Sequence, residues 1–197
     1  LQLGGPVDRS EPYLTLNYPT IVNIPENFTF QLHKGSELNT AGNTHYSLAG
    51  AQYTLYSSAA CTPGTEVAVL TTDANGDSNV VTGLVYGTSY YLKETKAPLN
   101  HKLDTNVYTI TKDTPTMNLT DSPELGSLNI EKYVEEGTVN DGTGMNPAAN
   151  VRFTLTMQEG TIPEASLTTD MNGKASLSEL PYGTYTLTED NPFSNYH

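Results

Sequence analysis

The stretch GTSYYLKETKAP (Gly87–Pro98) decides the fold of this chain, because the sequence that leads into it occurs twice. The run TTDANGDSNVVTGLVYGTSYYLKE (Thr71–Glu94) returns further along as TTDMNGKASLSELPYGTYTLTE (Thr168–Glu189). A segment that repeats in order and spacing predicts a repeated structural unit. With 197 residues, the chain is long enough for two domains of about 100 residues each.

The composition favours an all-β chain. Hydrophobic residues make up 36% of the sequence, which has 13 tyrosines, no tryptophan, 16 glycines and 12 prolines. Many short strands between glycine- and proline-rich turns are typical of β-sandwiches. The formal net charge of −13 argues against nucleic-acid and anionic-membrane partners, which need a basic surface. We find no run of about 18 apolar residues and therefore expect no membrane span in this chain.

Alternating apolar residues place the strands. In the first unit they indicate strands at Phe28–Lys34, Ala51–Tyr56, Ser89–Glu94 and Thr116–Asp121. The second unit starts the same order again at GSLNIEK (Gly126–Lys132). We expect the final strand of such a sandwich to pair beside the first.

The repeat also sets the expected domain boundaries. Residues 1–25 are interpreted as a lead-in or the end of a preceding domain, 26–122 as the first domain and 123–197 as the second. Compared with its sibling, the second unit lacks its last strands. We therefore expect it to be incomplete at its C-terminus, with one sheet edge left open.

Three ionisable residues end apolar strand faces in the first unit, namely Lys34, Glu94 and Asp121. Burial lowers the pKa of a lysine and raises that of a carboxylic acid. A neutral lysine amine is a nucleophile, and a neutral glutamic acid can transfer protons. Attack of the Lys34 amine on the Asp121 carboxyl carbon would expel water and leave an amide. The alternative is a set of solvated strand ends or a plain ion pair, and the recurrence of Lys132 and Glu189 in the second unit weakens it.

The motifs FxLxK, LAGAQYTLY, TTDANG and GTSYYLKETKAP, in this order, resemble the collagen-adhesin B-type (CnaB, or SpaA-type pilin) repeats of Gram-positive surface proteins. The resemblance covers Phe28–Asp121 and continues from Gly126 to the end of the chain. It implies two tandem reversed-immunoglobulin, prealbumin-like β-sandwiches. It also implies an autocatalytic isopeptide bond between a lysine and an asparagine or aspartate in each complete domain.

Carried over by position, the resemblance makes Lys34 the amine, Glu94 the catalytic acid and Asp121 the acyl partner. Lys132 and Glu189 take the first two roles in the second unit, and no acyl partner for Lys132 is found in this sequence. Asparagine is the commoner acyl partner in the family, and Asn118 lies nearby. Its strand parity points away from the core, so the choice between Asp121 and Asn118 stays open.

Other motifs suggest no further chemistry. The D-x-N-x-D-x-N run from Asp73 to Asn79 resembles a calcium loop, but a hairpin turn at Asn75-Gly76 explains it without a metal. The second unit has Lys174 where the first has Asp77, which favours the turn. We predict no metal site and no cofactor, and a hydrolase is disfavoured because no nucleophile motif is present. A single cysteine, Cys61, cannot form an intrachain disulfide.

The sequence therefore predicts a structural stalk or pilin segment of a Gram-positive surface adhesin, not an enzyme, apart from one self-cross-linking turnover. Thr20 stands where pilus shaft subunits of this family carry a linking lysine, which counts against a polymerised shaft. The expected location is the extracellular, cell-wall-anchored bacterial surface, with the anchor outside this sequence, and the expected partners are adjacent domains of the same protein. The alternative is a binding module whose loops, with Phe193 and Tyr196, recognise a host protein or glycan.

Overall fold

A computed structural model describes residue 24 and residues 26–135, 145–160 and 164–190. Most of the expected lead-in, including Thr20, and also Phe193 and Tyr196 lie outside these residues. No helix in the described part of the chain is long and apolar enough to cross a membrane. The described strands are β1 (Asn27–Ser36), β2 (Gln52–Tyr56), β3 (Glu66–Thr71), β4 (Val81–Val85), β5 (Tyr90–Lys96), β6 (Val107–Ile110), β7 (Thr116–Asp121), β8 (Leu125–Glu131), β9 (Tyr133–Glu135), β10 (Met145–Pro147), β11 (Arg152–Met157), β12 (Ala165–Thr168), β13 (Lys174–Pro181) and β14 (Tyr185–Glu189).

The first domain is a sandwich of two sheets, with strand orders β4-β1-β7 and β3-β2-β5-β6. The prediction that the last strand pairs beside the first is confirmed, since β7 runs parallel to β1 from Gln31↔Thr116 to Ser36↔Asp121. Parallel neighbours need a long crossover connection. Here the connection contains the whole second sheet, so the pairing of β1 with β7 brings the two ends of the domain together.

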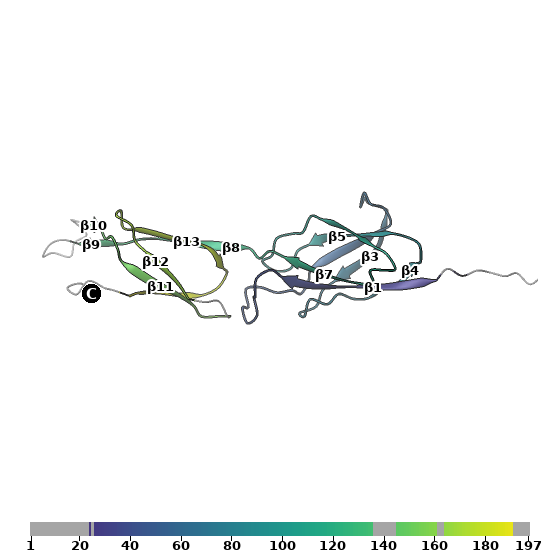
Figure 1. Cartoon of the computed structure of the whole chain (residues 1–197), viewed down its shortest axis with the longest axis horizontal. Helices are drawn as coiled ribbons and strands as arrows, with labels where there is room; N and C mark the ends of the chain where they lie inside the picture. The colour runs from purple at the N-terminus through teal and green to yellow at the C-terminus, as the bar shows by residue number, and fades with distance from the viewer. Residues whose placement is uncertain (1–23, 25, 136–144, 161–163, 191–197) are drawn as a thin grey trace, which may run out of the picture.

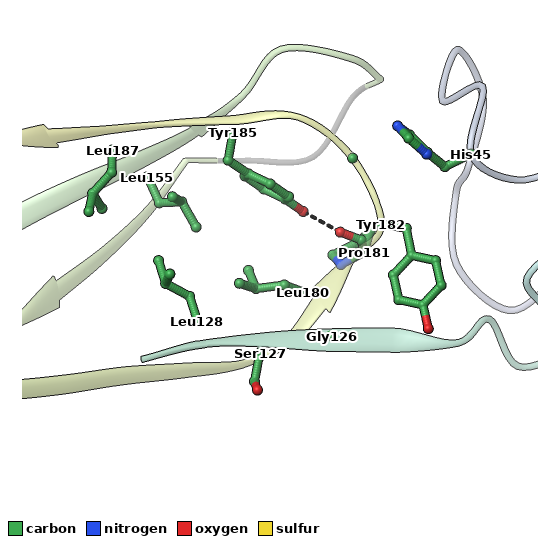
Figure 2. A pocket seen from close by; sticks show the side chains of 11 residues that line it. His45, Gly126, Ser127, Leu128, Leu155, Leu180, Pro181, Tyr182, Tyr185 and Leu187 are labelled. Carbon is green, nitrogen blue, oxygen red and sulfur yellow. Dashed lines mark hydrogen bonds between the residues drawn. The ribbon is translucent and has the colours of Figure 1, made fainter. Parts of the chain in front are cut away.

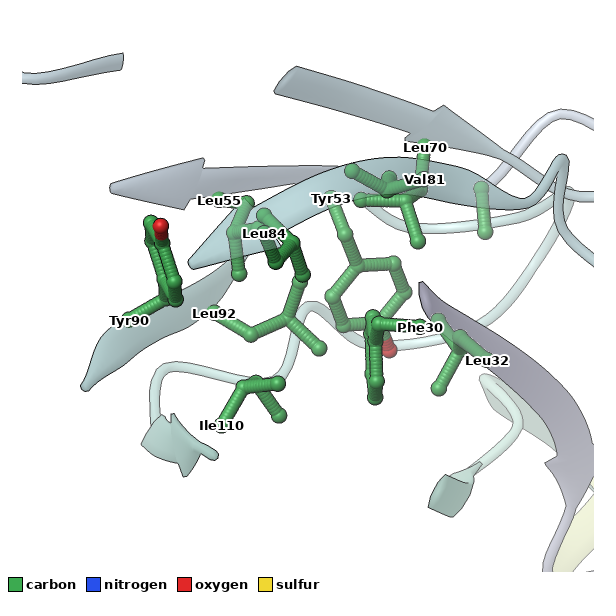
Figure 3. Packing of buried hydrophobic residues seen from close by; sticks show 11 residues of the cluster. Phe30, Leu32, Tyr53, Leu55, Leu70, Val81, Leu84, Tyr90, Leu92 and Ile110 are labelled. Carbon is green, nitrogen blue, oxygen red and sulfur yellow. The ribbon is translucent and has the colours of Figure 1, made fainter. Parts of the chain in front are cut away.

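The core of the first domain follows the alternation read from the sequence. Phe30 and Leu32 of β1 meet Tyr53 and Leu55 of β2, and all four side chains are fully buried. Figure 3 shows Leu92 of β5 and Ile110 lying against the same cluster. Ile110 of β6 belongs to this core, and Met117 and Leu119 of β7 pack against it.

The second domain repeats part of this plan in its described residues. Its described sheets have the orders β13-β8 and β12-β11-β14, which correspond to β4-β1 and β3-β2-β5. Within the described residues no strand pairs with the second edge of β8 or of β14, which are the places that β7 and β6 take in the first domain. The two tandem all-β sandwiches are confirmed, and they lie end to end (Figure 1). The short pair β9-β10 was not predicted.

Among the described residues, the inside of the second sandwich is less covered than that of the first. Leu187 is 40% exposed, whereas Leu92, at the equivalent position of the first domain, is fully buried. An apolar groove of about 520 Å³ opens between the sheets. Figure 2 shows leucines from β8, β11, β13 and β14 facing it together with Tyr185, and His45 of the first domain at one end. The leucines are Leu128, Leu155, Leu180 and Leu187.

Candidate functional site

The candidate site lies between the two sheets of the first domain. Lys34 comes from β1 and Asp121 from the neighbouring β7, while Tyr53 of β2 and Glu94 of β5 face them from the other sheet. Asp121 lies two residues beyond Leu119, the partner of Lys34 in the parallel ladder, so both side chains point to the same face. Tyr53 and Glu94 are direct cross-strand partners. Two pairs of neighbours therefore meet across the sandwich.

The four polar groups are in direct contact and shielded from water. The side chains of Lys34 and Glu94 are 0% exposed, and that of Asp121 is 1% exposed. The Lys34 Nζ donates a hydrogen bond to Asp121 Oδ1 and another, of 2.5 Å, to the Tyr53 hydroxyl. It lies 3.3 Å from Glu94 Oε1. One amine thus touches both carboxyl groups.

Burial governs the protonation of this cluster. It raises the pKa of Glu94, although a hydrogen bond from the Asp104 backbone and the charge of Lys34 act in the opposite direction. Burial also raises the pKa of the Tyr53 hydroxyl, helped by the nearby carboxylates of Glu94 and Asp121. Tyr53 therefore stays protonated and can donate a hydrogen bond, while Glu94 is shifted toward its neutral acid form.

A second layer of contacts fixes Glu94. The backbone N–H of Asp104 donates to Glu94 Oε2 at 2.6 Å. The Asp104 carboxylate in turn accepts the Tyr108 hydroxyl at 2.6 Å and the Asn106 backbone N–H at 2.9 Å. Partial burial raises the pKa of Asp104, but these hydrogen bonds outweigh it and leave the pKa lowered. The ionised Asp104 holds its own loop in place, and with it the N–H that positions Glu94.

The repeated turn supports the lysine. Gly76 has φ of +87° and accepts the Lys34 backbone N–H at 2.7 Å through its carbonyl. A Cβ at Gly76 would lie 2.0 Å from the Lys34 carbonyl oxygen, so only glycine fits here. The Asp73 carboxylate accepts the backbone N–H groups of Asn75 and Asp77, which makes the D-x-N-x-D run a turn stabilised by its own aspartate. No group of side chains that could hold a metal ion occurs among the described residues.

The structure brings together the three residues singled out in the first domain, Lys34, Glu94 and Asp121. Asn118 is exposed on the opposite face of β7, as its parity predicted. Sequence reasoning missed Tyr53 and Asp104. A tyrosine on an apolar face needs a partner for its hydroxyl when buried, and that requirement could have pointed to Tyr53. The contribution of Asp104 is a backbone N–H, which leaves no side-chain pattern to detect.

The second domain places Lys132 beside Glu189, as the repeat predicts. Lys132 Nζ donates to Glu189 Oε2 at 2.8 Å. The side chains are 31% and 22% exposed, in contrast to the buried pair of the first domain. Gly173 repeats the role of Gly76, because its carbonyl accepts the Lys132 backbone N–H at 2.8 Å. The local frame around each lysine is therefore the same, and the surroundings differ.

Several solved structures are similar to this chain. The structure described as "The Bacillus anthracis TIE protein" is 28% identical over 83% of this chain and 28% of that chain, with a TM-score of 0.57. The streptococcal ancillary pilin is 20% identical over 87% of this chain and 55% of that chain, with a TM-score of 0.36. BcpA, the major pilin subunit of Bacillus cereus, is 17% identical over 84% of this chain and 88% of that chain, with a TM-score of 0.39.

The chain spans about a quarter of the first of these structures and about half of the second. No curated protein matches the sequence. The structure thus defines a class of two tandem β-sandwiches, each with a lysine beside a glutamate between its sheets. The model of the SpaA family, described as a prealbumin-like fold domain, matches residues 29–123 and 136–197, and the chain belongs to this family.

Proposed function

We propose that this chain is a structural stalk or pilin segment of a Gram-positive surface protein, and that its first domain forms an amide between Lys34 and Asp121. The observation that carries the proposal is the shared burial of one amine and two carboxyl groups in direct contact. Such a cluster is costly as a set of charges. Conversion to an amide removes the charges of two of its three members.

The chemistry needs no group from outside the domain. With Glu94 protonated, transfer of one proton from the Lys34 ammonium to Asp121 gives a neutral amine and a neutral carboxylic acid. The amine attacks the Asp121 Cγ, and the C–N bond forms as the carbonyl electrons move to oxygen. Glu94 donates its proton to the departing hydroxyl as the bond between the Asp121 Cγ and that oxygen breaks, and it takes up the proton that the nitrogen loses, so Glu94 ends protonated as it began. Water leaves and the amide remains, while the Tyr53 hydroxyl, which accepts a hydrogen bond from the Lys34 Nζ, helps to position the amine.

The product would act as a mechanical staple between the first and the last strand. Lys34 and Asp121 are 87 positions apart. In the chain-entropy picture used for disulfides, a cross-link that closes a loop of this length stabilises a domain by about 4–5 kcal/mol. Because β1 and β7 are parallel neighbours, force applied along the chain would reach the staple before the core. This property suits an extracellular stalk that links adjacent domains.

Intact mass spectrometry of the purified chain tests the bond. We expect a mass one water below that of the sequence, with tryptic mapping that joins the Lys34 and Asp121 peptides. A loss of ammonia instead would assign the acyl role to an asparagine such as Asn118. The full sequence mass, measured on folded protein, would refute the cross-link.

For the second domain we propose that Lys132 and Glu189 take the same roles once a strand with an Asp or Asn side chain lies beside β8. The open groove and the unpaired edge of β8 within the described residues support this. The test is a synthetic strand with alternating apolar residues that ends in Asn. We expect a covalent adduct at Lys132, one ammonia lighter than the two components, and no adduct with the Glu189→Gln variant. Absence of any adduct after saturating incubation would contradict this role.

A further inference from the structure

A second set of buried polar contacts lies where the two domains meet. The loop that joins β1 to β2, residues 37–51, contains Asn43 and Tyr46, which are 5% and 6% exposed. Loop residues usually face water. Here both side chains find their partners on the second domain or on the short linker before β8, so the loop is shaped to receive that domain.

Tyr46 contacts three segments at once. Its hydroxyl donates to the Glu124 carbonyl in the linker at 2.6 Å and accepts the Tyr182 backbone N–H at 2.8 Å. Its ring stacks on the Tyr182 ring, with centroids 6.0 Å apart and planes 25° apart. The Tyr46 ring also contacts the His101 ring edge to face, with the ring centroids 5.5 Å apart. First domain, linker and second domain are all joined through one side chain.

Neighbouring contacts reinforce the same junction. Asn43 Nδ2 donates to the Tyr182 carbonyl at 2.8 Å, so the backbone of Tyr182 is held on both its N–H and its C=O. Thr44 Oγ1 donates to Glu159 Oε2, in the loop after β11, at 2.9 Å. A Cβ on Gly160 would lie 3.4 Å from Asn43 Cβ, which shows how closely the two loops approach.

The linker is itself attached to the first domain. The Glu124 backbone N–H donates to the Asn100 carbonyl at 2.8 Å, and Asn100 Nδ2 donates to the His45 carbonyl at 2.7 Å. A linker that is bonded along its length cannot act as a free hinge. Movement of the second domain would break the hydrogen bonds that Tyr46 and Asn43 make with the Tyr182 backbone.

We infer that loop 37–51 is a clasp that locks the second domain to the first in one orientation, with Tyr46 as its central residue. The inference deepens the proposed stalk role, because a stalk transmits direction only if its joints are stiff. The clasp does not depend on the Lys34–Asp121 bond. A stiff joint is therefore expected whether or not the cross-link forms.

The test is a distance distribution between two spin labels, one on the native Cys61 of the first domain and one on a Ser166→Cys variant in β12. Cys61 is a free thiol, and Ser166 is exposed. We expect one narrow distribution for this labelled chain. Tyr46→Ala and Tyr182→Ala should each broaden it, and Tyr46→Phe, which keeps the ring but loses the hydroxyl, should broaden it less. The matched control is Tyr86→Ala, since Tyr86 lies on the first domain outside the junction and packs on Phe28.

Unchanged widths in both Tyr46→Ala and Tyr182→Ala would overturn the clasp, as would an equally broad distribution in the unsubstituted chain. If Tyr46→Ala does not fold, Tyr182→Ala decides, because it leaves the first-domain loop intact. Intact mass is measured on the same samples. A full sequence mass together with a narrow distance distribution would refute the cross-link and support the clasp. A mass short by one water together with a broad distribution would support the cross-link and refute the clasp.

Discussion

The two lysine–glutamate pairs have equivalent places in their domains but different surroundings. Lys34 is fully buried and contacts Glu94, Asp121 and Tyr53. Lys132 is one-third exposed and is held by Glu189. In both domains the backbone N–H of the lysine donates a hydrogen bond to the carbonyl of a turn glycine. The repeated sequence therefore builds the frame for the lysine, and the two strands that only the first domain shows in the described structure create the buried environment.

The strand β7 makes two contributions in the first domain. It brings Asp121 beside Lys34, and its Met117 and Leu119 pack on the core. One strand thus supplies both the partner of Lys34 and part of the packing that excludes water from it. In the second domain the equivalent edge of β8 is unpaired within the described residues, and Leu187 remains exposed. A reactive lysine requires both parts, so the comparison predicts chemistry at Lys34 and an ordinary ion pair at Lys132.

The largest expected effect comes from Glu94→Gln. This variant keeps the size of the side chain but cannot relay protons, so we expect it to fold with the full sequence mass. Loss of the staple should lower the free energy of unfolding of the first domain by about 4–5 kcal/mol, or the melting temperature by about 20–30 °C. Calorimetry and intact mass provide the measurements. The matched control, Glu189→Gln, should change neither the intact mass nor the stability of the first domain. A water loss that persists in Glu94→Gln would show that Glu94 has a structural role only.

A smaller effect is expected where the two domains agree. Gly76→Ala forces a Cβ to 2.0 Å from the Lys34 carbonyl oxygen, and Gly173→Ala forces one to 2.4 Å from that of Lys132. Both glycines have positive φ, which alanine adopts only with strain. We expect a loss of about 1–3 kcal/mol in each domain. Gly50→Ala, also at positive φ but with open space around the Cβ, separates strain in φ from the collision. Equal losses in all three variants would mean that the contact with the lysine has no effect of its own.

Which residues of the site could be predicted from the sequence depends on the kind of contact they make. Period-two alternation placed Lys34, Glu94 and Asp121 on core faces, because side-chain direction in a strand follows from position alone. The hydroxyl of Tyr53 was missed because its partner comes from another strand and its ring already explains its place in the core. Tyr46 lies in a loop without periodicity, and its partners are 78 and 136 positions away. Contacts of this kind depend on how the domains dock, which a local pattern does not contain.

A pH dependence of stability reports on the buried carboxyl group of Glu94. In Lys34→Met the amide cannot form, and the charge that lowers the pKa of Glu94 is gone while burial still raises it. The folded state then binds a proton that the unfolded state releases at lower pH. Stability should be fully present below the unfolded pKa and fall as pH rises through the folded pKa, by about 1.4 kcal/mol for each pH unit that separates the two pKa values. Denaturant titrations at several pH values measure this slope, and Lys34→Met with Glu94→Gln should abolish the Glu94 contribution. A slope that is unchanged by the second substitution would show that another group titrates.

The smallest effect is expected at the second lysine. Lys132→Met removes a partly exposed ion pair, and such pairs contribute about 0–1 kcal/mol. The matched control is Lys174→Met, which breaks the exposed pair between Lys174 and Glu131 on the same sheet. We expect both variants to lose about the same small amount in urea titrations, and tryptic mapping to recover the Lys132 peptide unmodified. A loss of several kcal/mol for Lys132→Met alone would mean that Lys132 is as shielded as Lys34. The contrast between the domains would then lie in the presence of Asp121 rather than in the exclusion of water.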